Sequence, residues 1–278
     1  MTDRYTDYLT RQNSDIQRLN DQLDVMTDNI GYLLHPSITS SLPENPSIAD
    51  VATGTGRFLL LVRDSYPNGT FTGLDISSAN YPSPTDLPGN VNMTLLDVKK
   101  PIPEDLHGKY DVVHVRILVA AMLPEDWDPT VANLSLMLKP GGYLQWTECD
   151  CISMKHLRGK AESRVENLRF LGRAFTAALS DRLRHGWNTL PGHMEAAGLR
   201  PVLRDIVSSD RLPETRERAT VNSNLAFLST MRVLSKKGAP GAMTSEEIDA
   251  LETKVHEEIR SGAYLRYDIH VIVGRKPL

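Results

Sequence analysis

Residues 48–56 read IADVATGTG, and this stretch decides how the rest of the chain is organised. A short apolar run ends in a turn with two glycines, Gly54 and Gly56, and the helix-like segment 57–62 follows at once. This pattern predicts a β-strand, a tight loop and the start of a helix. Glycine lets the backbone approach a ligand closely, and the first turn of a helix presents free N–H groups to a carboxylate or a phosphate. The junction is therefore the expected site of a nucleotide-like cofactor.

The spacing within this loop argues against a dinucleotide. A diphosphate site needs the pattern G-x-G-x-x-G, in which the third glycine lets the helix pack close to the strand. That third position is Arg57 or Leu59 here, depending on where the count begins. The next predicted strand carries Asp75, 19 residues after Gly56, close to the ~20 at which an acidic residue ends the second strand and holds a ribose. We therefore expect a cofactor that has a ribose and no diphosphate.

Further segments follow in an order that carries a family resemblance. They are DVATGTG at 50–56, Asp75, LLDV at 95–98, YDVVHVR at 110–116 and LKPGGY at 138–143. Together they resemble the successive motifs of the class I S-adenosylmethionine-dependent methyltransferases. Three more segments resemble the fungal secondary-metabolism branch of that family: GYLLHP at 31–36, GYLQWTE at 142–148 and VIVGRKP at 271–277. The sequence departs from the family pattern at its first glycine, which is Ala52 here.

The resemblance implies a fold and a cofactor. The fold is α/β and Rossmann-like, with a seven-stranded, mostly parallel sheet, helices on both faces, an N-terminal helix and a helical insertion before the last strand. The cofactor is S-adenosyl-L-methionine, with Asp97 reading the adenine amino group, although an aspartate at this turn could instead bond its own backbone. The expected cofactor-binding residues are Asp50, Ala52, Thr53, Gly54, Gly56, Asp75, Ile76, Asp97, Val98 and Arg116.

Two titratable residues on the predicted central strands are candidate catalytic bases. The fifth strand, 143–148, ends at Glu148, which we expect at the rim of the pocket. His114 lies within the apolar fourth strand, 110–118. A solvated glutamate at a strand end and a hydrogen-bonded core histidine are the structural alternatives. Arg116, near the carboxyl end of the fourth strand, either holds a carboxylate or pairs with a neighbouring acid.

The chain divides into a core and three additions. Residues 1–47 form an N-terminal helical arm or lid, 48–207 the cofactor-binding core, 208–262 a helical insertion that covers the substrate, and 263–278 the terminal strand. The insertion is expected because a connection between strands usually needs only ~2–6 residues. The arm carries an apolar stripe at helical spacing from Ile16 to Ile30. This stripe either packs on the core beside the cofactor or exchanges with a second copy in a homodimer.

Composition sets further expectations about partners and location. Charged residues make up 24% of the chain and its net charge is −4, so we expect no nucleic-acid partner. The first twenty residues contain no apolar core, and no run is long enough to span a membrane, so a cytoplasmic protein without a membrane partner is expected. The two cysteines, Cys149 and Cys151, are expected to be reduced thiols. A strained disulfide or half of a metal site is the alternative, and no metal is expected.

The function expected from this pattern is methyl transfer from S-adenosylmethionine to O, N or S of a small-molecule secondary metabolite. The sulfonium methyl is already electrophilic, so the protein must place the acceptor, exclude water and take a proton where the acceptor has one to lose. Two alternatives remain. One is a regulatory or interaction protein that keeps the fold as a scaffold, and the other is a catalyst of a rearrangement that holds the cofactor without transferring its methyl.

The position of Asp75 generates a quantitative prediction. Its two carboxylate oxygens match the two adjacent ribose hydroxyls, and hydrogen bonds to a charged group contribute ~1.5–3 kcal/mol each. Losing both costs about 3 kcal/mol or more, so Asp75→Ala should weaken cofactor binding about a hundredfold while the fold survives. Calorimetry on a variant with an unchanged melting curve checks this. A dissociation constant within threefold of the wild-type value would contradict the role.

Overall fold

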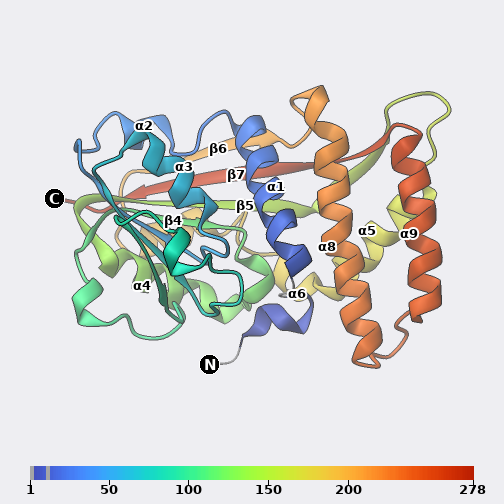
Figure 1. Ribbon diagram of the computed structural model, residues 1–278, viewed down its shortest axis with the longest axis horizontal. Helices are drawn as coiled ribbons and strands as arrows, with labels where there is room; N and C mark the ends of the chain where they lie inside the picture. The colour runs from blue at the N-terminus through green and yellow to red at the C-terminus, as the bar shows by residue number, and fades with distance from the viewer. Residues whose placement is uncertain (1–2, 11–12) are drawn as a thin grey trace.

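The computed structural model describes residues 3–10 and 13–278, and its seven strands form one sheet. The strand order is β3-β2-β1-β4-β5-β7-β6 (Figure 1). β7 runs antiparallel to β5 and β6, and the remaining neighbours are parallel. This is the expected Rossmann-like architecture. The strands are β1 (Ser47–Val51), β2 (Thr70–Asp75), β3 (Val91–Leu95), β4 (Tyr110–Arg116), β5 (Leu138–Arg158), β6 (Val202–Ser208) and β7 (Ala263–Arg275).

Helices cover both faces of the sheet, and each face has its own hydrophobic core. The α-helices are α1 (Asn13–Ile30), α2 (Pro36–Thr39), α3 (Arg57–Ser65), α4 (Trp127–Met137), α5 (Glu166–Ala178), α6 (Ser180–Leu183), α7 (Leu190–Ala196), α8 (Arg216–Lys236) and α9 (Ser245–Arg260). Short 3₁₀ helices include η1 (Arg4–Asp7), η2 (Pro84–Asp86), η3 (Glu104–Leu106), η4 (Val119–Ala121), η5 (Pro124–Asp126) and η6 (Pro213–Thr215). Helices α1 to α3 supply apolar residues to one core, whereas α4, α5 and α7 to α9 supply the other.

The central strands are buried because they are covered from both sides. In β1 every residue after Ser47 is buried, and β4 contains four consecutive buried residues. Near-continuous apolar runs of this kind are typical of parallel strands inside an α/β sheet. On the α4 side, Trp127 packs against Trp146 of β5, with ring centroids 5.3 Å apart. These strands therefore give the loops at their carboxyl ends a rigid base.

The fifth strand is much longer than the sequence pattern predicts. We expected 143–148, but β5 spans Leu138–Arg158 and pairs with β7 as far as Arg158 opposite Ala263, with a register shift between Asp150 and Lys155. Polar and apolar residues are mixed without regular alternation after 148, so the strand pattern fades there. They remain a strand because β7 supplies hydrogen-bonding partners. Helix α5 lies against β5, and α8 and α9 lie against β7 (Figure 1). The third and fourth strands, expected from the sequence at 91–98 and 110–118, end earlier, at Leu95 and Arg116.

The N-terminal helix and the inserted helices lie against one another. α1 contacts α3 and α8 of its own chain, and its residues Leu23 and Met26 are buried. The segment 208–262 holds η6, α8 and α9. The pattern TSEE at 244–247 predicts a helix cap, and α9 begins there. The Thr244 hydroxyl accepts from the Glu247 amide at 3.2 Å, and the Glu247 carboxylate accepts from the Thr244 amide at 2.8 Å. In the single chain, the apolar stripe of the arm is thus covered intramolecularly.

Two further features concern expectations from composition. Cys149 is buried, Cys151 is partly buried, and both are free thiols. Among the helices of the described residues, none combines the length and the hydropathy needed to cross a bilayer.

Candidate active site

A pocket lies at the carboxyl ends of β1, β2, β3 and β4, the edge at which open α/β sheets bind ligands. Together with the open solvent space at its mouth, the pocket encloses about 930 Å³. Eight of the predicted cofactor-binding residues line it: Ala52, Thr53, Gly54, Asp75, Ile76, Asp97, Val98 and Arg116. The structure therefore brings together residues from four separate loops. Asp50 and Gly56 do not line this pocket.

The glycine loop turns sharply through a series of left-handed residues. The φ angles are 57° at Ala52, 56° at Gly54 and 72° at Gly56. The loop is tied to β2, because the Thr53 amide donates to the Leu74 carbonyl at 3.1 Å. A left-handed conformation suits glycine but strains alanine by roughly 1–2 kcal/mol. Ala52, the departure from the family pattern, therefore occupies a position that favours glycine.

Backbone strain in the described chain concentrates at the pocket. Among the described residues, the non-glycine residues with positive φ are Ala52 and Ile117, with φ of 57° and 47°. Both line the pocket, one after β1 and the other after β4. Such strain persists only where the surrounding structure fixes the backbone, and it is typical of ligand-binding sites.

Asp75 faces the pocket and also orders the glycine loop. Its carboxylate accepts from the Gly54 amide at 3.0 Å and from the Ser77 amide at 3.1 Å. The residue is 5% exposed. The carboxylate is therefore placed at the end of β2, as predicted, and the loss of cofactor affinity expected for Asp75→Ala includes a contribution from the loop that this side chain holds.

Asp50 and His114 form a buried pair behind the loop. Asp50 accepts from the Thr53 hydroxyl at 2.7 Å and lies 2.7 Å from Nδ1 of His114. The His114 ring stacks on Phe58, with centroids 3.6 Å apart. Both residues are buried and outside the pocket lining. Asp50 supports the loop through Thr53, and His114 is hydrogen-bonded within the core. The cofactor contact of Asp50 and the base role of His114 stay predictions.

Gly56 also has a packing role. A Cβ atom at this position would lie 2.1 Å from Cε of Met93. The residue precedes the first turn of α3 and adopts a left-handed conformation. The absence of a side chain therefore leaves room for the Met93 side chain of β3 beside the start of α3. The expected contact between Gly56 and the cofactor stays a prediction.

Glu148 is not at a strand end, so the predicted rim position is wrong. It lies within β5, is 0% exposed and is absent from the pocket lining. One oxygen, Oε1, accepts from the Leu118 amide at 2.8 Å, the Val119 amide at 3.2 Å and Trp146 Nε1 at 2.9 Å. Burial raises the pKa of Glu148 to about 7, and these hydrogen bonds oppose the shift. Glu148 thus holds the strained loop that begins at Ile117.

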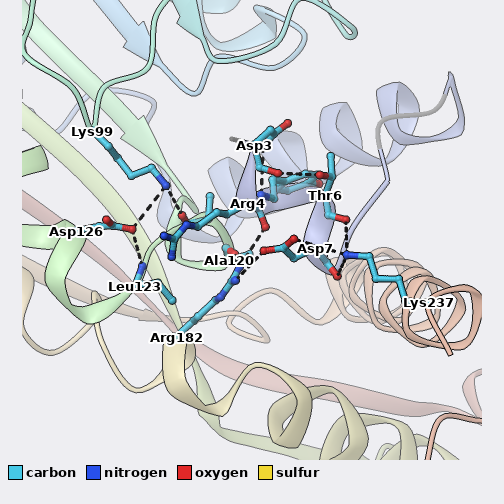
Figure 2. Close-up of polar contacts among 12 residues, drawn as sticks. Asp3, Arg4, Thr6, Asp7, Lys99, Ala120, Leu123, Asp126, Arg182 and Lys237 are labelled. Atoms are coloured by element: carbon cyan, nitrogen blue, oxygen red, sulfur yellow. Dashed lines mark hydrogen bonds and ion pairs between the residues drawn. The ribbon is translucent and has the colours of Figure 1, made fainter. Parts of the chain in front are cut away.

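The N-terminal segment supplies pocket residues that sequence reasoning missed. Arg4 and Tyr5 from η1 and Asp3, which caps this helix, line the pocket, together with Leu19 and Gln22 from α1. Arg116 donates to Oε1 of Gln22 at 2.7 Å, so it joins the pocket to α1. Figure 2 shows η1 beside Lys99, a further lining residue. The apolar stripe predicted that α1 packs somewhere on the core, but no local signal assigned Asp3 to Tyr5 to the pocket.

The pocket fits S-adenosylmethionine in its chemistry. Asp75 suits ribose hydroxyls, Asp97 after β3 suits an amino group, and the left-handed Gly54 leaves room for a close ligand. The fold and this site together define a class I methyltransferase.

Comparisons with known proteins agree with this class. Residues 49–144 match the family model described as a methyltransferase domain. The chain is 32% identical over 290 residues to methyltransferase grgD of Penicillium sp, covering 97% of this chain and 96% of the relative. It is 25% identical to N-methyltransferase sirN of Leptosphaeria maculans, covering 94% and 91%.

A solved structure shares the fold. It is phosphoethanolamine N-methyltransferase 2 of Haemonchus contortus in complex with S-adenosyl-L-methionine, with a TM-score of 0.50 and 11% identity, covering 93% of this chain and 53% of that chain. The chain belongs to the S-adenosylmethionine-dependent methyltransferases, and S-adenosylmethionine is its cofactor.

The strain at Ala52 generates a stability prediction. Ala52→Gly should leave the melting temperature unchanged or raise it, because relief of roughly 1–2 kcal/mol of strain offsets the greater flexibility of glycine in the unfolded chain. Ala132→Gly, at an exposed position of α4, is the matched control and should cost about 0.5–1 kcal/mol. Thermal melts of both variants check this. Equal destabilisation at the two sites would show that Ala52 is not strained.

The burial of Glu148 generates a pH prediction. Its pKa is raised from 4.5 to about 7, so between these values the folded protein keeps a proton that the unfolded chain has lost. This carboxyl therefore contributes stability below pH ~4.5 that is lost as pH rises through ~7. Glu148→Gln keeps an oxygen for the three donors and should flatten the fall in melting temperature across this window. Glu148→Ala leaves those donors unpaired and should destabilise at every pH. Identical pH profiles for wild type and Glu148→Gln would contradict the assignment.

Proposed function

We propose that this methyltransferase transfers the methyl group to a nitrogen of a small secondary metabolite. When bound, S-adenosylmethionine supplies an electrophilic methyl group. The observation that carries the small-molecule proposal is that η1 and α1 of the chain itself supply lining residues opposite the strand ends, so the pocket is partly enclosed. An acceptor must therefore enter a partly covered space, which suits a small molecule better than a macromolecular surface.

The nitrogen acceptor is supported by relatives and by the lining of the pocket. Several relatives are named N-methyltransferases, from Leptosphaeria maculans, Claviceps purpurea and Clonostachys rogersoniana. The two side chains first considered as bases, His114 and Glu148, lie outside the pocket. A neutral amine attacks through its own lone pair, and its proton is lost after transfer. Such an acceptor needs placement more than it needs a base.

The described residues suggest how the acceptor is placed. Ile117, Leu118 and Met122 give the loop after β4 an apolar surface, and Arg116 and Gln22 lie beside it. The apolar side chains exclude water, and the polar pair orients the polar groups of an acceptor. Arg116 is held by Gln22 at 2.7 Å, so its guanidinium is fixed before a ligand arrives.

Two measurements test the proposal. Mass spectrometry of the purified protein identifies the co-purifying cofactor, and S-adenosylhomocysteine is expected because it is the product of turnover. Incubation with methyl-labelled cofactor and matched amine, phenol and thiol acceptors should then label the amine. Gly54→Val is the negative control, since a branched side chain at φ 56° fills the ligand side of the loop and should abolish cofactor binding. Labelling of oxygen or sulfur alone would overturn the nitrogen assignment. Intact cofactor that labels no acceptor would favour a role without methyl transfer.

A further inference from the structure

A single side chain outside the pocket joins two of its walls. Arg182 lies on α6 and its side chain is 6% exposed. Its guanidinium donates to the Arg4 carbonyl at 3.2 Å, to the Ala120 carbonyl, and to the Asp7 carboxylate at 3.2 Å. Figure 2 shows these contacts converging on Arg182 from η1 and from the loop after β4. Arg4 itself lines the pocket, and so do Ala121 and Met122, which follow Ala120.

The N-terminal segment Asp3–Thr10, here named the cover, is held from a second side as well. The guanidinium of Arg182 also lies over the ring of Tyr8, 4.6 Å from its centroid. Lys237, at the end of α8, donates to the Thr6 carbonyl at 3.3 Å and the Asp7 carbonyl at 3.0 Å. It also lies 3.6 Å from the Asp7 carboxylate (Figure 2). The two cations thus approach the cover from α6 and α8.

Arg182 and Lys237 differ in how strongly each holds the cover. Lys237 and Asp7 are about half exposed, with side chains 49% and 48% accessible, so water screens their attraction. Arg182 is almost fully buried, and removing it leaves the carbonyls of Arg4 and Ala120 without this donor. Charge-assisted hydrogen bonds from a planar guanidinium are also the more directional. Arg182 therefore contributes more than Lys237 to holding the cover in place.

We propose that Arg182 is a positioning residue that holds the cover closed over the cofactor and thereby sets the rate at which the cofactor and its product leave. Arg182 does not itself line the pocket, so it acts through Arg4, Asp7 and the Ala120 loop. A ligand that lies under the cover leaves when the cover moves, and each movement breaks the contacts of Arg182. Weakening them speeds release, whereas the geometry at the reacting end changes less.

The experiment measures release of S-adenosylhomocysteine from the full-length protein by stopped-flow competition, so it needs no methyl acceptor and is independent of the acceptor proposed above. Arg182→Met should raise the dissociation rate about tenfold or more, the factor expected for losing one charge-assisted hydrogen bond. Asp7→Ala should raise it by a smaller factor. Arg232→Met is the matched control, because Arg232 pairs with Asp249 and Glu252 on the surface, outside the cofactor pocket. It should leave the rate unchanged.

A double-mutant cycle separates this role from a purely structural one. If Arg182 acts through the cover, the double variant Arg182→Met/Asp7→Ala should raise the dissociation rate by less than the product of the factors measured for the two single variants. Should Arg182→Met fail to fold, Asp7→Ala and Lys237→Met still test the cover, and both should speed release. A lower melting temperature with an unchanged dissociation rate would overturn the proposal. So would fully multiplicative effects in the cycle.

Discussion

Three buried carboxylates, those of Asp50, Asp75 and Glu148, hold the loops that form the pocket, and the site depends on them. Asp50 bonds the Thr53 hydroxyl, Asp75 accepts from the Gly54 amide, and Glu148 accepts from two amides of the loop after β4. Each comes from a different strand and reaches a loop at the carboxyl end of the sheet. Backbone N–H groups in loops at a ligand-binding surface lack the regular partners of a helix or a sheet, yet they must be paired when buried. The carboxylates supply acceptors to such groups and thereby fix the turns.

The same arrangement explains why strain is tolerated at Ala52 and Ile117. Each strained residue follows a buried strand and precedes a turn that a carboxylate holds by hydrogen bonds. Relaxing its backbone angles would disturb the strand or break those hydrogen bonds. Two further elements complete the pocket from outside the sheet. α1 is joined to the glycine loop and α3 by the Asn20–Thr55 hydrogen bond at 2.7 Å and the Asp24–Arg57 ion pair at 2.8 Å, and η1 is held by α6 and α8. Polar contacts thus close a site whose base is apolar.

Several features of this protein were predictable because their signals are local. The glycine loop, the acid at the end of β2 and the capped helix α9 each follow from a short pattern whose geometry is set by neighbouring residues. The length of β5 was not predictable, because its second half lacks a regular alternation of polar and apolar residues and is a strand through pairing with β7, more than a hundred residues away. The role of Gly56 was likewise hidden, since its neighbour Met93 comes from another strand.

From the sequence alone, the order of the motifs and their resemblance to a known family indicated the fold class and the cofactor. The glycine loop and Asp75 indicated a ribose-bearing ligand at the carboxyl ends of the strands, because a glycine turn between strand and helix and an acid about 20 residues later are local patterns. Tertiary structure decided which charged residues face the pocket. Glu148 and His114 carry titratable side chains of a kind that often acts in catalysis. Both are buried here, and Glu148 is hydrogen-bonded to the loop after β4 and His114 to Asp50. Asp3, Arg4 and Tyr5 carry no motif, and tertiary contacts place their segment at the pocket, among them those of Arg182 with Arg4, of Lys237 with Thr6 and of Arg18 with Tyr5. Side-chain direction in a packed core depends on all the neighbours at once, and a linear pattern does not specify them.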